Sequence, residues 1–406
     1  MTGPDTKARG ILQAIGIDAR VLAMLAALIA IWLAFHALTD GLFLTPRNLW
    51  NLAVQTSVVG VLATGMVLII VARHIDLSVG SVLGFVGMTL AVFQVTIFTP
   101  GAGWNTPATI GVALIVGIAA GAFQGWWIAY RLVPAFIVTL AGLLMFRGGA
   151  WMLTSGRTLA PMEPDFQVLG GGLTGAIGAP ASWALGFGAS AIVVALAVRG
   201  RQRKATFGFP VRPWWGEIVR MGLWVCAILG FVAVMNSYLQ PRTAIPMGIP
   251  VPVLILIVIV LAMEVMTRTT AFGRYIYAMG GNPEATRLSG VDTRKVTFLL
   301  FALMGALAAI AGIIATARLN AGTNSTGELA ELSVIAAAVI GGTSLAGGVG
   351  TISGAILGAI IMQSLQNGMV LMGLPSALQS VIIGAVLIIA VWIDVTYRRR
   401  LTRSPT

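Results

Sequence analysis

Charged residues are scarce in this chain. Of its 406 residues, 9% are Asp, Glu, Lys or Arg and 58% are apolar, whereas soluble globular domains carry about 25% charge. A soluble fold of this length would lack the polar residues needed to cover its surface. The composition therefore excludes a soluble enzyme, a disordered chain and a nucleic-acid-binding protein. It favours an all-α, polytopic membrane protein.

Lysine, histidine and cysteine are nearly missing. None of the three lysines stands in a G-x-x-x-x-G-K-[ST] pattern, so the chain has no P-loop for ATP. The two histidines, His36 and His74, and the one cysteine, Cys226, have no metal-ligand spacing and allow no internal disulfide. We therefore expect no metal site, no cofactor and no nucleotide site, and any energy source must lie in a partner.

A hydrolase motif is nearly present. Ser344 stands in a segment close to G-x-S-x-G, but Ala346 replaces the last glycine. A Ser344–His74 dyad in an intramembrane hydrolase is one hypothesis, although no orienting acid is evident. We favour the alternative that the chain has no catalytic residue.

Long apolar runs fill the sequence. A helix that spans a bilayer needs about 20 mostly apolar residues, and that criterion predicts about twelve crossings. They lie at 21–38, 52–72, 78–98, 108–130, 134–153, 183–198, 218–236, 251–267, 296–317, 329–346, 351–370 and 376–394. The short run at 183–198 and the glycine-rich run at 329–346 leave the count open by one or two.

The basic residues predict the orientation. With the N-terminus in the cytoplasm, 20 of the 25 Lys and Arg residues fall in inner segments and five in outer segments. This asymmetry follows the positive-inside rule and supports an even number of crossings, which places both termini in the cytoplasm.

Two segments interrupt the apolar pattern with glycines and hydroxyls. One is Arg73–Ser81 and the other is Gly341–Gly350. Unwound backbone inside a membrane is tolerated where it lines a cavity, which would place Asp76, Ser78 and Ser344 on a translocation pathway. Equally, each segment could be a tight turn in which Asp76 and Ser78 cap the next helix. Both segments fall on the inner side of the predicted topology.

Neutral amides recur inside the predicted spans. Asn51 and Gln55 lie one helical turn apart, and Gln363, Gln366 and Asn367 share a helix face. Amides can bind hydroxyl groups without the cost of burying an ion, which suits a neutral polyol. The alternative is hydrogen bonding between helices.

Acidic residues do not clearly occupy the middle of any predicted span. Four acids lie near span ends, where they are expected to reach the interface: Glu264, Glu328, Glu331 and Asp394. A charge at mid-membrane would indicate ion coupling, so this placement weakens the hypothesis of an ion-coupled secondary sugar transporter.

The longest predicted inner loop, at about 268–295, reads FGRYIYAMGGNPEATRLSGV at 272–291. It resembles the coupling loop of the permease subunits of sugar-importing ABC transporters, with Glu284, Ala285 and Gly290 in the positions of that superfamily's "EAA…G" motif. The resemblance implies that this loop contacts an ATPase through residues that share one segment: Gly281, Asn282, Pro283, Glu284, Ala285, Arg287 and Gly290.

Other segments are similar to the ribose, galactose, arabinose and xylose permease family. They are HIDLSVGS at 74–81, VPAFIVTLAGLLMFRG at 133–148 and GGTSLAGGVG at 341–350. An extra helix pair at about 183–236 resembles the xylose permease branch. The family usually has Gly or Glu where His74 stands, and the second Ala of its motif is here Thr286.

The resemblance implies an ABC importer permease fold, a single transmembrane domain over 1–406 with two extra helices, in a bacterial inner membrane. It implies a substrate such as D-xylose and no enzymatic activity in this chain. It also implies four partners: a cytoplasmic tandem-cassette ATPase, a periplasmic sugar-binding protein, a second copy of the chain and the lipid bilayer.

Overall fold

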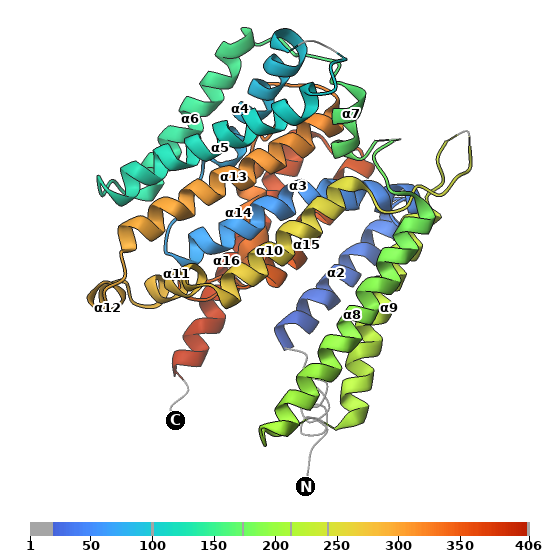
Figure 1. The fold of residues 1–406 in the computed structure, drawn as a ribbon, viewed down its shortest axis with the longest axis vertical. Coiled ribbons are helices and arrows are strands. Elements are labelled where there is room, and N and C mark those ends of the chain that lie inside the picture. Colours follow the sequence, from blue (N-terminus) through green and yellow to red (C-terminus); the bar gives the residue numbers. More distant parts are fainter. Residues whose placement is uncertain (1–18, 99–100, 173, 212, 242, 404–406) are drawn as a thin grey trace.

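The computed structural model describes residues 19–98, 101–172, 174–211, 213–241 and 243–403, and these residues form a bundle of helices (Figure 1). Strands are absent from this part of the chain, which has only isolated β-bridges. The helices are α2 (Ala19–Leu38), α3 (Pro46–Val71), α4 (Val79–Val92), α5 (Asn105–Ala129), α6 (Ala135–Thr154), α7 (Pro164–Gln167), α8 (Gly178–Thr206), α9 (Trp214–Ser237), α10 (Val251–Thr269), α11 (Ala271–Gly281), α12 (Pro283–Leu288), α13 (Thr293–Leu319), α14 (Ala330–Ile340), α15 (Ile352–Leu371) and α16 (Ser376–Arg403).

Twelve apolar helices correspond to the twelve predicted runs. Within the described residues, ten helices are long and apolar enough to cross a membrane, and α14 and the 376–392 part of α16 are shorter. The polytopic all-α prediction is confirmed. One boundary is wrong: the run predicted at 329–346 ends as a helix at Ile340, because the glycines that follow form a turn. Eleven residues rise only about 16 Å, so α14 alone does not cross a core of about 30 Å.

The centre of the bundle is α3. It packs against α10, α13, α14 and α15, and 89% of its most apolar window is buried. Glycines permit a very close helix contact between α5 and α13. A Cβ atom on Gly117 would lie 2.5 Å from the carbonyl oxygen of Gly305, so these backbones touch as small-residue helix faces allow.

The predicted extra helix pair is a hairpin of α8 and α9 that projects beside the bundle (Figure 1). One end holds it to the core. The indole of Trp50 donates a hydrogen bond to the carbonyl of Gly248 at 3.0 Å, and the amide of Ile249 donates to the hydroxyl of Ser182 at 2.9 Å. The opposite end carries the loop between the two helices.

The predicted coupling loop folds as α11 and α12, between the long helices α10 and α13. The first turn of α2 and the last turn of α16 lie in the same lower half of the molecule as α11 and α12 (Figure 1). The prediction that both termini are cytoplasmic concerns in part residues 1–18 and 404–406, which lie outside the described residues.

Candidate functional site

The short helix α12 is built from strong start signals. The side chain of Asn282 accepts a hydrogen bond from the amide of Ala285 at 3.0 Å, and Pro283 follows at the first helical position. Glu284 lies in the first turn and Arg287 in the last, where each charge is favourable to the helix dipole. Gly290, at a φ of +87°, reverses the chain after the helix.

The surface of α12 faces away from the protein. Thr286 alone among residues 281–290 is buried, and its hydroxyl donates to the carbonyl of Asn282 at 2.7 Å. The other residues of this segment are exposed, including all seven that the motif singled out. The position at which this chain departs from the superfamily motif therefore points inward, and the remaining positions form an accessible surface.

The segment between α3 and α4 is a tight turn. The carboxylate of Asp76 accepts hydrogen bonds from the amide of Ser78 at 2.8 Å and from its hydroxyl at 2.6 Å. Burial raises the pKa of the Asp76 carboxyl, and the two bonds from Ser78 act against that rise. The Ser78 hydroxyl also lies 3.0 Å from the amide oxygen of Gln124 on α5.

The two glycine- and hydroxyl-rich segments meet each other at the end of α11. The amide of Gly348 donates to the carbonyl of Val71, at the end of α3, at 2.9 Å. Arg73 donates to the carbonyls of Gly280 and Gly281, at 2.7 Å and 2.8 Å. A Cβ atom on Gly280 would collide with the carbonyl of Val71 and lie 2.5 Å from the amide of Gly348. Three backbone segments therefore pack without side chains between them.

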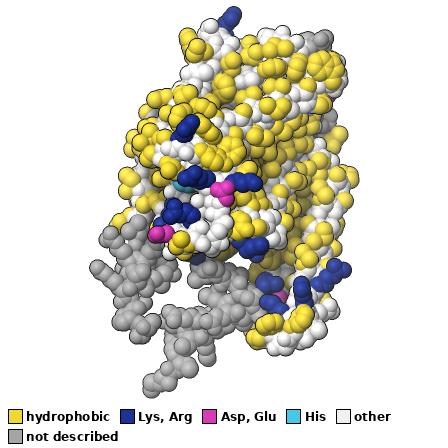
Figure 2. Space-filling view, turned by 60° about the vertical axis from the view of Figure 1, so that its left-hand side comes forward, with side chains coloured by type: hydrophobic (Ala, Val, Ile, Leu, Met, Phe, Trp, Pro, Cys, Tyr) yellow, Lys and Arg dark blue, Asp and Glu magenta, His cyan; other side chains and the backbone are white. Residues whose placement is uncertain are grey.

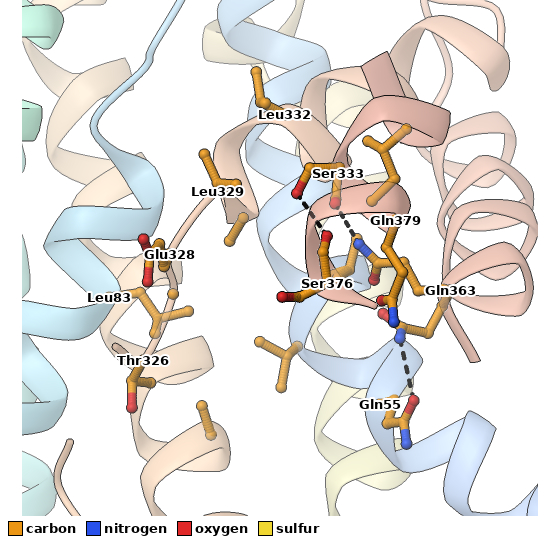
Figure 3. A pocket seen from close by; sticks show the side chains of 18 of the residues that line it. Gln55, Leu83, Thr326, Glu328, Leu329, Leu332, Ser333, Gln363, Ser376 and Gln379 are labelled. Atoms are coloured by element: carbon orange, nitrogen blue, oxygen red, sulfur yellow. Dashed lines mark hydrogen bonds between the residues drawn. The ribbon is translucent and has the colours of Figure 1, made fainter. Parts of the chain in front are cut away.

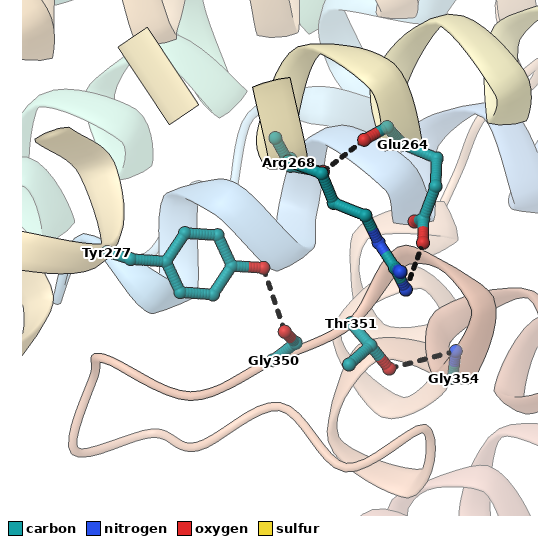
Figure 4. Close-up of polar contacts among 7 residues, drawn as sticks. Glu264, Arg268, Tyr277, Gly350, Thr351 and Gly354 are labelled. Carbon is teal, nitrogen blue, oxygen red and sulfur yellow. Dashed lines mark hydrogen bonds and ion pairs between the residues drawn. The ribbon is translucent and has the colours of Figure 1, made fainter. Parts of the chain in front are cut away.

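A side-chain hydrogen bond from Tyr277 ties α11 to the turn before α15 (Figure 4). The phenol of Tyr277 donates to the carbonyl of Gly350 at 2.8 Å. Burial raises the pKa of this phenol, so it stays protonated and able to donate. Next to it, Glu264 and Arg268 form an ion pair at 2.5 Å across one turn of α10. Helix α11, which leads directly into α12, thus contacts both interrupting segments.

A cavity of about 410 Å³ lies between α3, α13, α15, α16 and the segment before α14 (Figure 3). Its volume falls in the range of small-molecule sites. Its polar lining combines amides, hydroxyls and two charges: Gln55, Arg318, Glu328, Ser333, Gln363, Gln366, Ser376, Gln379 and Ser380.

Amide hydrogen bonds cross this cavity. Gln363 donates to the side-chain oxygen of Gln55 at 3.2 Å, and Gln366 donates to the hydroxyl of Ser333 at 2.8 Å (Figure 3). Each amide keeps further donors and acceptors available. Such side chains can exchange their mutual hydrogen bonds for bonds to the hydroxyl groups of a neutral sugar.

The structure divides the seven predicted pathway residues. Gln55 and Gln363 line the cavity. Asn51 is half-buried on α3 outside the cavity lining, and Asn367 accepts a hydrogen bond from the side chain of Asn48 at 2.9 Å. This contact is a hydrogen bond between α3 and α15, the alternative role that the sequence allowed for the amides. On the predicted helix face, Gln363 and Gln366 therefore line the cavity, whereas Asn367 bonds to a neighbouring helix.

Asp76, Ser78 and Ser344 stand in turns and not in the cavity lining. The hydroxyl of Ser344 is fully buried and accepts a hydrogen bond from the amide of Ala346 at 3.1 Å. His74 packs its ring against that of Phe301, 5.8 Å between centroids, and burial lowers its pKa. These contacts match a tight turn, although the side chain of Ser78 makes no capping hydrogen bond to α4, and each side chain of the hypothetical dyad is engaged elsewhere.

One expectation about the acids is wrong. Glu331 does not reach the interface, because it lies in the first turn of α14 and is only 6% exposed. Its Oε2 has no hydrogen-bond partner among the described residues, and it faces Gly80 of α4. No group of three or more His, Cys, Asp or Glu residues that could hold a metal exists within the described residues.

Four residues of this region were missed from sequence. Arg73 resembled one more positive-inside residue, and Tyr277 an ordinary aromatic of the inner loop. Gly280 preceded the motif, and Ser333 was one hydroxyl in an apolar run. The G-G at 280–281 before the helix cap was the one available signal of a close backbone approach.

Within the residues that the structure describes, ten candidate spans, a polar cavity among them and an exposed short helix joined to both interrupting segments define a membrane-embedded permease. The comparisons give the family. The chain belongs to the family described as "Branched-chain amino acid transport system / permease component", whose model matches residues 48–391, and within it to the sugar ABC permeases.

Curated relatives cover almost the whole chain. The xylose transport system permease protein XylH of Escherichia coli (strain K12) is 44% identical over 386 residues, 95% of this chain and 94% of that protein. XylH of Haemophilus influenzae is 40% identical over 393 residues, 95% and 98% of the two chains. The ribose import permease protein RbsC of Escherichia coli (strain K12) is 34% identical, with 87% of each chain covered. No solved structure matches the chain.

Proposed function

We propose that this chain is the membrane-spanning subunit of an ATP-driven importer of D-xylose, in a bacterial inner membrane with both termini in the cytoplasm. Similarity to relatives named as xylose permeases, at 40–44% identity, supports the sugar. The asymmetry of the basic residues supports the orientation. The single observation that carries the mechanism is the contact of α11 with both interrupting segments.

In this proposal, a separate cytoplasmic ATPase with tandem cassettes binds the exposed face of α12. That face is built from the motif residues 281–285, 287 and 290. ATP binding and hydrolysis in that partner move α12 and, through α11, the ends of α3 and the turn before α15. Both helices line the cavity, so the movement changes its opening. The two conformations differ in their contacts with the ATPase, as a driven switch requires.

The sugar enters from a periplasmic binding protein and passes through the cavity, with a second copy of the chain completing the transporter. The amides at Gln55, Gln363 and Gln366 bind sugar hydroxyls and release them, since neutral hydrogen bonds are individually modest, about 1 kcal/mol each. The other predicted pathway residues are proposed to support the walls of the cavity: Asn51, Asp76, Ser78, Ser344 and Asn367.

A second candidate, an ion-coupled secondary sugar transporter, is favoured by one observation: in the part of the chain that the structure describes, the buried carboxylate of Glu331 has an oxygen without a hydrogen-bond partner. Buried ionisable groups in membrane segments mark ion or proton pathways in many proteins.

Uptake by cells separates the two candidates. Radiolabelled xylose is offered to cells that express this chain with its transport partners, after an uncoupler has collapsed the ion gradient while ATP is maintained. The ATP-driven importer continues to accumulate xylose. Loss of accumulation under these conditions would establish the second candidate.

A further inference from the structure

The α8–α9 hairpin is packed tightly at one end only. The buried residues of α8 are Ser182, Gly186 and Ser190, all in its first half. A Cβ atom on Gly186 would lie 2.8 Å from a methyl group of Val232, so the helices touch there. On α9, no residue between Gly216 and Val232 is buried. Beyond Ser190 no residue of α8 is buried, and on the facing part of α9 only Gly216, near the start of that helix, is buried.

A groove of about 640 Å³ lies along this part of the hairpin. Its walls are apolar except at two positions, and the residues are Ser190, Ala191, Val194, Ala195, Val198, Arg199 and Val225. The hydroxyl of Ser190 is already used, because it donates to the carbonyl of Gly186 at 2.8 Å. The groove thus offers hydrocarbon contact along its length and one guanidinium, that of Arg199, at its end. A sugar would find almost no partner here.

Cations continue from the end of the groove. Arg199 and Arg203 lie one helical turn apart on α8 and are exposed, and Lys204 follows. Glu217, the acidic residue in the first turn of α9, pairs with Arg220 at 3.3 Å. The end of the groove is therefore a positively charged site.

Length and aromatic residues place these cations at the membrane surface. The 29 residues of α8 rise about 43 Å, compared with a hydrocarbon core of about 30 Å. Its last turns therefore reach the headgroup layer. Phe207, Phe209, Trp214 and Trp215 are each at least half exposed beside them, and Arg201 lies 4.1 Å from the ring centroid of Trp214. Aromatic side chains of this kind belong at the membrane interface.

We propose that the α8–α9 groove binds an anionic phospholipid, with an acyl chain against Val194, Ala195 and Val198 and the phosphate on Arg199 and Arg203. The apolar walls, the cationic end and the position in the headgroup layer together fit this one class of ligand. A second copy of the chain would bring its own basic residues to the same site, and an acidic soluble protein would leave the apolar groove unfilled.

The proposal is tested on the full chain in nanodiscs that contain equal amounts of dioleoylphosphatidylglycerol and dioleoylphosphatidylcholine. After mild detergent release, native mass spectrometry counts the phosphatidylglycerol retained. Two cations at a membrane surface contribute about 1 kcal/mol each, so Arg199→Gln with Arg203→Gln should weaken retention roughly 30-fold. The matched control replaces the exposed pair Arg294 and Lys295 by Gln, which leaves retention unchanged.

A second variant tests the groove itself. Ala195→Phe fills it and should also lower retention of phosphatidylglycerol, whereas Ile192→Phe, exposed on α8 outside the groove, should not. The proposal is overturned if all variants retain the lipid equally, if both basic pairs matter equally, or if a second copy occupies the hairpin instead. Circular dichroism confirms that each variant is folded, and the result is independent of whether the chain transports xylose.

Discussion

Arg73 caps the end of α11 from the turn that follows α3. Its Nε donates to the carbonyl of Gly280 at 2.7 Å and its terminal nitrogen to that of Gly281 at 2.8 Å. The last carbonyls of a helix lack partners within the helix and carry the negative end of its dipole. A guanidinium is the group best suited to satisfy both. The bonds couple any movement of α11 directly to the end of α3.

Removal of this cap should uncouple transport. Hydrogen bonds from a charged group contribute about 1.5–3 kcal/mol each, and Arg73 is exposed, so solvent screening limits the loss to the lower value. We expect Arg73→Gln to lower ATP-driven xylose uptake roughly tenfold while the ATPase still binds. Uptake into membrane vesicles and co-purification of the ATPase measure the two effects.

The control for Arg73→Gln is Arg274→Gln on α11, the helix whose end Arg73 caps. That guanidinium is exposed and, among the described residues, donates only to the carbonyl of Thr269 at the end of α10, at 3.2 Å. It should leave uptake close to that of the unmodified chain. Equal losses in both variants would show that positive charge alone, and not the link to Gly280, matters.

Adjacent glycines provide a sharper comparison. At Gly280 an added methyl group meets the carbonyl of Val71 at the end of α3 and the backbone of Gly348, whereas at Gly281 no atom of the described residues lies within 4 Å. We expect Gly280→Ala to lose most of its uptake and about 1–3 kcal/mol of stability, the usual effect of overpacking. Gly281→Ala should behave as the unmodified chain. Thermal melting in detergent and vesicle uptake test this, and a tolerated Gly280→Ala would contradict the close packing of α11.

The two amide pairs of α15 should separate transport from stability. Gln363→Leu removes a cavity amide and should raise the sugar concentration for half-maximal uptake about tenfold, with a small change in melting temperature. Asn367→Leu leaves the buried side chain of Asn48 without that acceptor, which costs about 1–3 kcal/mol, but spares the cavity. If Asn367→Leu alters xylose affinity more than Gln363→Leu, the assignment of the cavity as the sugar path is wrong.

The exposed face of α12 should govern partner binding. Glu284→Lys reverses a charge on that face and should abolish co-purification of the ATPase while the chain remains in the membrane. Asp165→Lys is the matched control, because Asp165 is exposed on α7 at the other end of the molecule (Figure 1). Retention of the ATPase by Glu284→Lys would argue against α12 as the docking surface.

Hydropathy predicted the helices well, because each long apolar run has only one stable structure in a membrane. It could not predict that the turn after α3 and the turn before α15 touch, since residues 71 and 348 meet only through tertiary packing. For the same reason Arg73 looked like a solvated inner cation. The helix face of Gln363, Gln366 and Asn367 was predictable, but its division between the cavity and Asn48 depends on which helices lie beside α15.

The surface of the molecule is that of a protein embedded in lipid with basic clusters toward one end. In the face shown in Figure 2, apolar side chains cover most of the body and the basic residues gather toward the lower part. The apolar surface requires lipid around it. The basic clusters are therefore available for the two contacts proposed at that end, one with an ATPase and one with an anionic headgroup.

Reconstitution tests the central claim most directly. The purified chain is placed in liposomes with its ATPase and sugar-binding protein, and accumulation of labelled xylose is measured with ATP and with an imposed ion gradient. The account predicts accumulation only with the complete set of partners and ATP, insensitive to an uncoupler. Uphill movement of xylose by this chain alone, driven by the ion gradient, would contradict it.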